Sequence, residues 1–273
     1  MIKESKKKMF SANYFTYDDV FSGTYGLYIA DFNDSAVTET AAFTPTLNTI
    51  KPSGINRFFH NGITYESAPS YQFSFVSEIE IPDTVRREIL TWLVGRKEYK
   101  KLKIHQVDLE NYYYNCVFTS ADIIYVNGKC HGFRVTATFD SHFARMEPII
   151  ITEDVTTETK RVTFMSYSDI PDSFSFPIVE FTSSEASANA YLEIKHVDTM
   201  QTFRIEGPMI ADEKITVDGE TRTILSTRGG ERLSYLKNKQ WLKIISDNNN
   251  RLDISSSGGT VKIYLPQYAM IGF

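Results

Sequence analysis

Short segments of alternating apolar and polar residues, separated by turn residues, fill the chain between positions 207 and 263. One of them, ITVDGETRTILS (residues 215–226), places Asp218-Gly219 between two strand-forming stretches. Both central residues of a two-residue type I′ turn need φ > 0, which this dipeptide tolerates, so an antiparallel hairpin centred on Asp218-Gly219 is predicted. The segments ERLSYLKNKQWLKI, RLDIS and TVKIYL follow as further predicted strands. Strands and turns that recur at this spacing are typical of a β-sandwich.

The composition agrees with a mainly β protein of about two domains. At 273 residues the chain exceeds the usual size of one domain. It contains 19 Phe and 16 Tyr beside 2 Trp, and aromatic and β-branched residues suit the half-buried faces of sheets. A charged, threonine-rich stretch begins at residues 145–148, where a long predicted hairpin ends. We therefore expect one domain over residues 1–146 and a second over residues 147–273.

One helix is expected, in the sequence PDTVRREILTWLVG. Apolar residues recur at i, i+4 and i+8 from Val85, which gives the segment one apolar face. Asp83 or Thr84 is the expected N-cap, and Gly95 ends the helix. The helix, at about residues 83–94, should lie with its apolar face on a sheet.

Strands are expected on both sides of this helix. Residues 62–81 alternate, with Tyr71, Phe73 and Phe75 on one face, and Pro69 inside the run marks an edge or a bulge. After the helix, the segments LKIHQVDL, YYYNCVFTSADIIYV and KCHGFRVTATFDSHF complete the expected sheet.

The two cysteines are expected to be free thiols. An Asn127-Gly128 turn makes a two-residue hairpin that pairs Tyr125 with Cys130. Cys116 then lies roughly 30 Å further along the strand, at about 3.3 Å per residue, whereas a disulfide needs Cα atoms within about 7 Å of each other. Unpaired cysteines are typical of a protein that folds in a reducing cytoplasm.

The charge of the chain argues against sequence-specific binding of nucleic acid. The formal net charge is −5, whereas a protein that neutralises phosphates needs a basic surface. The one basic cluster, Lys3 with residues 6–8, is interpreted as a solvated tail. No apolar run of about 18 residues is found, so no membrane span is expected.

We expect no catalytic site, no metal site and no cofactor. The histidines show neither HxxxH nor HExxH spacing, and they are His60, His105, His131, His142 and His196. GxSxG, Walker and GxGxxG motifs are also absent from the sequence. Glu78 and Glu80 stand two apart on a predicted strand, a separation of about 7 Å that a glycosidase can use. A solvated strand face explains this pair more simply.

Exposed aromatic residues form the expected binding surface. Tyr112, Tyr113 and Tyr114 are consecutive on a predicted strand, so at least one ring should face solvent, where aromatic side chains favour contacts with proteins or sugars. Packing inside the sheet is the alternative for two of them. Trp241, in a predicted strand with Leu242, is assigned to the core.

Three motifs in this order carry a family resemblance. The first is FTYD followed by YGLY (residues 15–28), a polar strand that leads into a Gly-Leu turn. The second is the predicted helix followed by KEYKKLKI, and the third is the ILS strand (residues 224–226) with the later LKNKQWLKI. Together they resemble the distal tail proteins of long-tailed, non-contractile bacteriophages of the siphovirus type. The leading MIKESKKK is extra, and residues 31–56 differ from the family's patterns.

The resemblance implies a fold and a function. Members of this family have an N-terminal split β-barrel-like ring domain with one α-helix, followed by a C-terminal galectin-like β-sandwich. They form a six-membered ring in the tail tip of the virion, which joins the tail tube protein to the tail-tip protein and supports receptor-binding or baseplate components. Such a protein folds and assembles in the host bacterial cytoplasm. Tyr65, Tyr71, Phe73 and Phe75 are expected near the ring interface or in the core beneath it.

Two other functional classes remain open at this point. A carbohydrate-binding tail or cell-surface module would hold a cell-wall or host glycan through exposed Tyr or Trp side chains. A glycan-degrading enzyme would depend on Glu78 or Glu80. We expect a structural hub.

Overall fold

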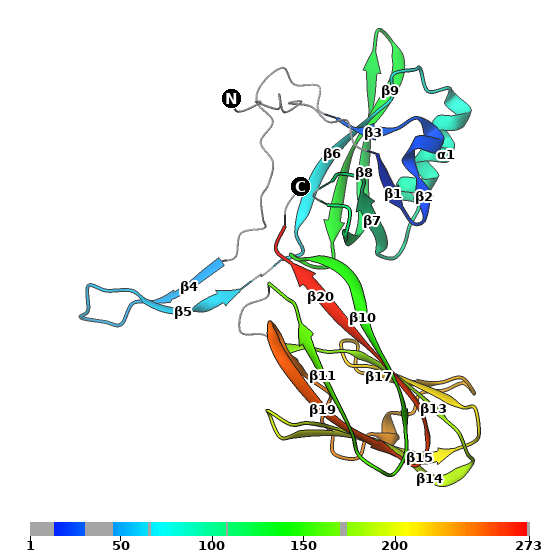
Figure 1. The fold of residues 1–273 in the computed structure, drawn as a ribbon. Helices are drawn as coiled ribbons and strands as arrows, with labels where there is room; N and C mark the ends of the chain where they lie inside the picture. Colours follow the sequence, from blue (N-terminus) through cyan, green and yellow to red (C-terminus); the bar gives the residue numbers. More distant parts are fainter. Residues whose placement is uncertain (1–13, 31–45, 65–66, 108, 170–173, 272–273) are drawn as a thin grey trace, which may run out of the picture. The chain divides into compact units, whose positions relative to one another are not determined.

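The computed structural model describes residues 14–30, 46–64, 67–107, 109–169 and 174–271 (Figure 1). The chain divides into two compact units, the first of residues Met1–Ala144 with Met270–Phe273 and the second of Arg145–Ala269. Strands dominate both units, so the predicted mainly β fold class is confirmed. The lysine-rich tail and Tyr65 lie outside the described residues.

The first unit contains a single α-helix and several strands among its described residues. In chain order they are β1 (Phe15–Tyr17), β2 (Val20–Phe21), the 3-10 helix η1 (Ser22–Tyr25), β3 (Tyr28–Ile29), β4 (Thr46–Ile50), β5 (Phe59–Thr64), β6 (Ser70–Val76), α1 (Asp83–Val94), β7 (Lys100–Ile104), β8 (Tyr112–Val126) and β9 (Lys129–Phe139).

A curled antiparallel sheet forms the body of this unit. Its strands pair in the order β2-β1-β7-β8-β9-β6-β3. Phe15 of β1 and Phe75 of β6 lie near opposite ends of this path, yet their rings stack with centroids 4.1 Å apart. The sheet must therefore curve back on itself around the core, as a split barrel does.

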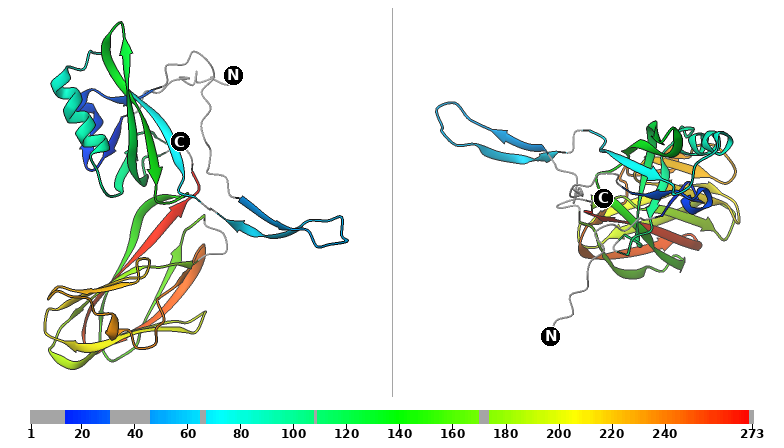
Figure 2. Two further views of the ribbon diagram at one scale, coloured as in Figure 1. Left: turned by 180° about the vertical axis from the view of Figure 1, so that it is seen from behind. Right: turned by 90° about the horizontal axis from the view of Figure 1, so that it is seen from above.

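Helix α1 covers one side of this core beside β1 and β8 (Figure 1 and Figure 2). Its buried residues are Ile89, Trp92 and Leu93. The indole N–H of Trp92 donates to the carbonyl oxygen of Tyr17 at 2.9 Å, so the polar end of the ring is satisfied inside the core. The predicted bounds are confirmed, but the predicted side-chain cap is wrong. Pro82 occupies the N-cap position, and no side chain caps the helix there.

The long β8–β9 hairpin follows its predicted turn. Asn127 and Gly128 have φ angles of 50° and 79°, as a type I′ turn requires. Tyr125 pairs with Cys130, and Cys116 pairs with Phe139 at the other end of the hairpin. Both cysteines are buried and free, which confirms the predicted thiols.

The predicted strand over residues 62–81 is wrong in its extent. β5 ends at Thr64 and β6 begins at Ser70, directly after Pro69. β6 ends at Val76, and residues 77–82 form an irregular connection that leads into α1. Glu78 and Glu80 therefore do not lie on a strand, and the Glu80 carboxylate pairs with the Lys129 ammonium at 2.6 Å.

The second unit is built almost entirely of strands. In chain order its described elements are β10 (Ala144–Val155), β11 (Lys160–Ser166), β12 (Phe174–Ser175), β13 (Ile178–Ser183), β14 (Ser187–His196), β15 (Gln201–Met209), β16 (Lys214–Asp218), β17 (Thr223–Ser226), the 3-10 helix η2 (Leu233–Tyr235), β18 (Ile244–Ile245), β19 (Asn248–Ser256) and β20 (Gly259–Ala269).

Two sheets of this unit pack face to face as a β-sandwich. One has the order β17-β16-β13-β20-β10 and the other β11-β19-β14-β15, with β12 and β18 paired beside them. Alternate residues of both sheets point into one core, among them Phe181 of β13, Ile194 of β14 and Ile254 of β19. Period-two alternation in each strand supplies the apolar inner faces, as the sequence predicted.

Two local predictions in this unit are wrong. The β16–β17 hairpin exists, but Asp218 pairs with Thr223, so the loop has residues 219–222 and is not a two-residue turn. The Asp218 carboxylate accepts hydrogen bonds from the backbone N–H groups of Glu220 and Thr221, which stabilises the longer loop. The expected strands over residues 231–243 are instead a 3-10 turn with isolated bridges and bends, and strand β18 begins only at Ile244.

Candidate assembly surfaces

Apolar side chains are exposed on the hairpin formed by β4 and β5. Leu47, Ile50, Phe58 and Phe59 are each between 46% and 62% exposed. Cations lie over two of the rings. The Lys51 ammonium is 5.4 Å from the centre of the Phe58 ring, and the Arg57 guanidinium is 5.7 Å from the centre of the Phe59 ring. A two-stranded hairpin is at best marginally stable in water. Its exposed apolar residues therefore indicate contact with another surface.

Sequence reasoning did not identify this hairpin. The available signal was the turn dipeptide Ser53-Gly54 between two segments rich in β-branched and aromatic residues. Gly54 indeed adopts φ = 82° in the turn.

A second exposed aromatic group lies at the β2 end of the sheet. The rings of Tyr14 and Phe21 pack in a tilted arrangement with centroids 5.2 Å apart, and both are almost half exposed. Tyr28 and His105 complete the group, at 6.4 Å from Tyr14 and 5.6 Å from Phe21. Burial, with a smaller contribution from Lys103, lowers the pKa of His105. Among the described strands β2 pairs only with β1, so this edge combines free backbone groups with apolar rings.

The residues predicted for the ring interface lie mostly in the core. Phe73 and Phe75 are buried, and Tyr71 is half-buried with its ring 4.8 Å from that of Phe73. Phe73 and Phe75 thus lie in the core, which was one of the two places predicted for them.

Of the three residues of the expected aromatic surface, Tyr112 and Tyr113 are half-buried and Tyr114 is in the core. Tyr114 is buried, and its hydroxyl donates to the carbonyl oxygen of Ile271 at 2.5 Å. Tyr112 packs against the core and Tyr113 lies under the Lys101 ammonium, 4.0 Å from its ring centre. Tyr112 and Tyr113 keep part of their surface exposed, and their role in binding stays a prediction, whereas Tyr114 takes the packed position that was the alternative.

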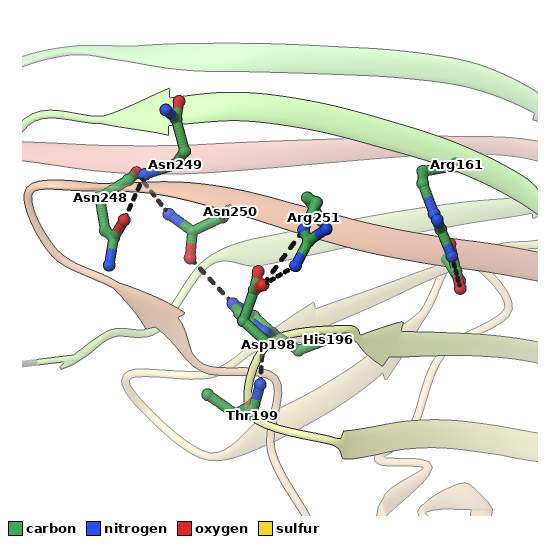
Figure 3. Close-up of polar contacts among 9 residues, drawn as sticks. Arg161, His196, Asp198, Thr199, Asn248, Asn249, Asn250 and Arg251 are labelled. Carbon is green, nitrogen blue, oxygen red and sulfur yellow. Dashed lines mark hydrogen bonds and ion pairs between the residues drawn. The ribbon is translucent and has the colours of Figure 1, made fainter.

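A buried polar network organises one edge of the second unit (Figure 3). His196 and Asn250 are both fully buried. The Thr199 backbone N–H donates to Nδ1 of His196, so Nε2 carries the proton and donates to Oδ1 of Asn250 at 2.9 Å. The Asn250 amide also bonds the N–H and carbonyl of Ile245 and the carbonyl of Asn248. All polar atoms of both side chains are used, so this network is a structural clamp.

Ion pairs follow β19 beside this network (Figure 3). Arg161 bonds both carboxylate oxygens of Asp253 at 2.7 and 2.8 Å, and Arg251 pairs with Asp198. Hydrogen bonds from the guanidinium groups are the largest cause that lowers the pKa values of Asp253 and Asp198.

Metal-ligand side chains, a groove along α1 and the Cys116 thiol are the other features of the described residues that bear on chemistry. Within the described ranges, no three His, Cys, Asp or Glu side chains gather as a metal site requires. A groove along α1 is lined by Arg87, Arg96 and Trp92, with Glu88 as its one carboxylate. Burial raises the pKa of the Cys116 thiol, which keeps it protonated and unreactive. No helix in the described part of the chain has the length and apolar character to cross a membrane.

Two family models match the sequence. One, described as the phage tail protein N-terminal domain, matches residues 10–141, and the other, described as the phage tail C-terminal domain, matches residues 143–265. The chain belongs to this family of phage tail proteins. Family and fold are therefore those of structural components of the phage tail. No curated protein matches the sequence of this tail protein.

The fold of the tail protein is similar to solved tail components. The crystal structure of the phage SPP1 Dit protein, described as a paradigm of hub adsorption apparatus in Gram-positive infecting phages, matches with a TM-score of 0.65 and 13% identity, covering 94% of this chain and 99% of that chain. Chains of the phage P2 baseplate in its activated conformation match with TM-scores of 0.54 (with Ca) and 0.57 (with Sr). Their identities are 9% and 10%, with 94% and 93% of this chain and 98% of each baseplate chain covered. The predicted resemblance is confirmed at the level of family and fold.

Proposed function

We propose that this protein is the hub of a phage tail tip, a ring that joins the tail tube to the baseplate. The observation that carries the proposal is the similarity of fold to SPP1 Dit, which extends over 94% of this chain and 99% of that protein. Both units are included in the match, so the similarity is to a whole hub protein and not to one shared domain. A ring of six copies follows from the distal tail family that the sequence resembles.

The exposed apolar residues of the first unit are the proposed ring contacts. Identical subunits close a ring through heterologous contacts, in which one patch meets a different patch of the next copy. The β4–β5 hairpin and the Tyr14–Phe21 group are two such patches, and each exposes aromatic side chains. Burying them would contribute about 25 cal/mol per Å² of apolar surface. Tyr71, Phe73 and Phe75 support these contacts from the core beneath.

The proposed hub acts by holding neighbours in place. Its partners are further copies of itself, the tail tube protein and the tail-tip protein, and the second unit supports receptor-binding components. Assembly takes place in the host cytoplasm, where two free thiols persist. We assign no reaction and no cofactor to the protein.

Negative-stain images and native mass spectrometry of the purified protein test this proposal. We expect six-membered annuli, either alone or with the tail tube protein present. The paired substitutions Leu47→Ser and Phe58→Ser should reduce the fraction of annuli, because each removes an exposed apolar side chain from the hairpin. Met200→Ser is the matched control, since Met200 is equally exposed but lies in a turn of the second unit. A protein that stays monomeric with and without the tube protein would refute the ring.

A further inference from the structure

Two cations and three aromatic rings gather on the second unit, and we name these five residues the cation–aromatic patch. They are Arg222, Lys243, Phe174, Phe176 and Trp241. The Arg222 guanidinium lies 4.2 Å from the centre of Phe176 and 5.3 Å from that of Trp241. The Lys243 ammonium lies 5.2 Å from the centre of Phe174 and 6.0 Å from that of Phe176. Phe174 is 47% exposed, so the patch opens to solvent.

The backbone holds this patch in place from both sides. Leu242 and Ile244 are buried in the sandwich core, whereas the alternate residues Trp241 and Lys243 are half-buried, with Trp241 packed against the edge of that core. The Gln201 side chain fixes this segment, because its amide donates to the Trp241 carbonyl and accepts from the Lys243 N–H. The prediction that Trp241 is a core residue of a strand is therefore wrong. Trp241 is half-buried at the rim of the core and lies outside any strand.

The β16–β17 loop places Arg222 over the rings. A Cβ on Gly219 would come within 3.0 Å of Phe176 Cβ, so glycine allows the loop to pack closely on Phe176. Arg222 itself adopts φ = 60°, a left-handed conformation in which Asp and Asn are the usual non-glycine residues. A strained arginine at a defined position is a reason to look for function.

The positive charge of the patch is not neutralised by the described residues. Neither Arg222 nor Lys243 has a carboxylate oxygen within 4.0 Å among the residues that the structure describes. Arg204 of this unit differs, since it lies over Tyr191 and also pairs with Glu193 and Glu206. The acidic residues of the β16–β17 loop are engaged elsewhere. Asp218 accepts from backbone N–H groups, and Glu220 lies beside Tyr268 and Arg145.

We propose that the cation–aromatic patch binds an extended acidic segment of a partner protein, which rests on the proposed hub function. Charge complementarity favours an anionic partner, because the patch holds two uncompensated cations on a chain of net charge −5. Stacking between rings occupies the flat side of Arg222 and leaves its N–H edge for bidentate binding of a carboxylate.

The spacing of the cations fits an extended peptide. Both lie over the same Phe176 ring, at 4.2 and 6.0 Å from its centre, so they are no more than about 10 Å apart. Acidic residues two apart in an extended strand project from the same face at about 7 Å. A sugar fits less well, because cations already lie over the ring faces on which a pyranose would stack.

Binding of a labelled peptide to the full-length protein tests the inference. The probe is a short labelled peptide in which Thr and Glu alternate, and its binding is measured by fluorescence polarisation. A peptide in which Thr and Gln alternate is the neutral control. We expect the acidic peptide to bind, and we expect its affinity to fall as salt is added. Arg222→Gln and Lys243→Gln should each weaken binding by about tenfold, the loss of one charge-assisted contact.

Arg228→Gln is the matched control variant. Arg228 is an exposed arginine close by in sequence, and no described ring or carboxylate lies against its side chain. Its replacement therefore removes the same charge without changing the patch. Equal loss in this variant, equal binding of the neutral peptide, or no binding at all would overturn the inference. Tighter binding of polyglycerol phosphate, with displacement of the peptide, would assign the patch to a wall polymer instead. Ring formation by Arg222→Gln is measured in the same images. If this variant forms annuli but the wild type does not bind the peptide, the patch inference fails while the hub proposal stands.

Discussion

Replacing Asn250 with alanine tests whether the buried network at His196 holds the second unit together. The Asn250 amide makes four hydrogen bonds, to the His196 ring, to both backbone groups of Ile245 and to the Asn248 carbonyl. Alanine leaves the fully buried His196 ring without its acceptor, and the part-buried hydrogen bonds to Ile245 and Asn248 are also lost. At a net value of about 1 kcal/mol for each hydrogen bond, we expect the free energy of unfolding to fall by about 3–4 kcal/mol. This is a large share of the roughly 5–15 kcal/mol by which a domain is stable.

The two tryptophans allow the unfolding of each unit to be measured separately. Trp92 lies in the core of the first unit and Trp241 at the rim of the second core. In a Trp92→Phe background, fluorescence during urea unfolding reports only on the second unit. The same background serves every variant, so any cost of Trp92→Phe cancels from the comparison.

Asn249→Ala provides the control for this measurement. Asn249 is the neighbouring residue on β19, but it is exposed and its side chain makes no hydrogen bond within the described chain. Its replacement should change the free energy of unfolding by no more than about 0.5 kcal/mol. A cost below about 1 kcal/mol for Asn250→Ala, or equal costs for both variants, would refute the idea that satisfied buried polar groups stabilise this edge.

Two further predictions concern pH and the thiols. Guanidinium hydrogen bonds lower the pKa values of Asp253 and Asp198, so the stability that they contribute is present above the ordinary Asp pKa of about 3.9 and is lost as pH falls through the lowered values. Urea midpoints of the second unit should therefore decline with acid, and a smaller decline is expected in Asp253→Asn. Cys116 and Cys130 are buried, so a thiol reagent should modify both in urea and neither in the native protein. Rapid labelling of the native protein would show that the β8–β9 hairpin is open.

Local patterns were sufficient wherever one segment decides its own structure. The helix at Asp83–Val94 follows from its apolar repeat, and the turn at Asn127-Gly128 from two residues that tolerate φ > 0. The free thiols follow from the length of one strand. The order of short motifs along the chain was also enough to indicate the tail protein family, because the whole sequence contributes to that pattern.

Only the tertiary structure decided which side chains are exposed and which lie together. Exposure of Tyr113 and Tyr114 depends on what packs against β8, which is Lys101 of the neighbouring strand for Tyr113 and Ile271, near the other end of the chain, for Tyr114. Arg222 and Trp241 meet because a loop packs on Phe176, a contact that no periodicity encodes. The physical reason is that periodicity assigns a residue to a face, whereas burial and charge compensation depend on the elements that pack against that face.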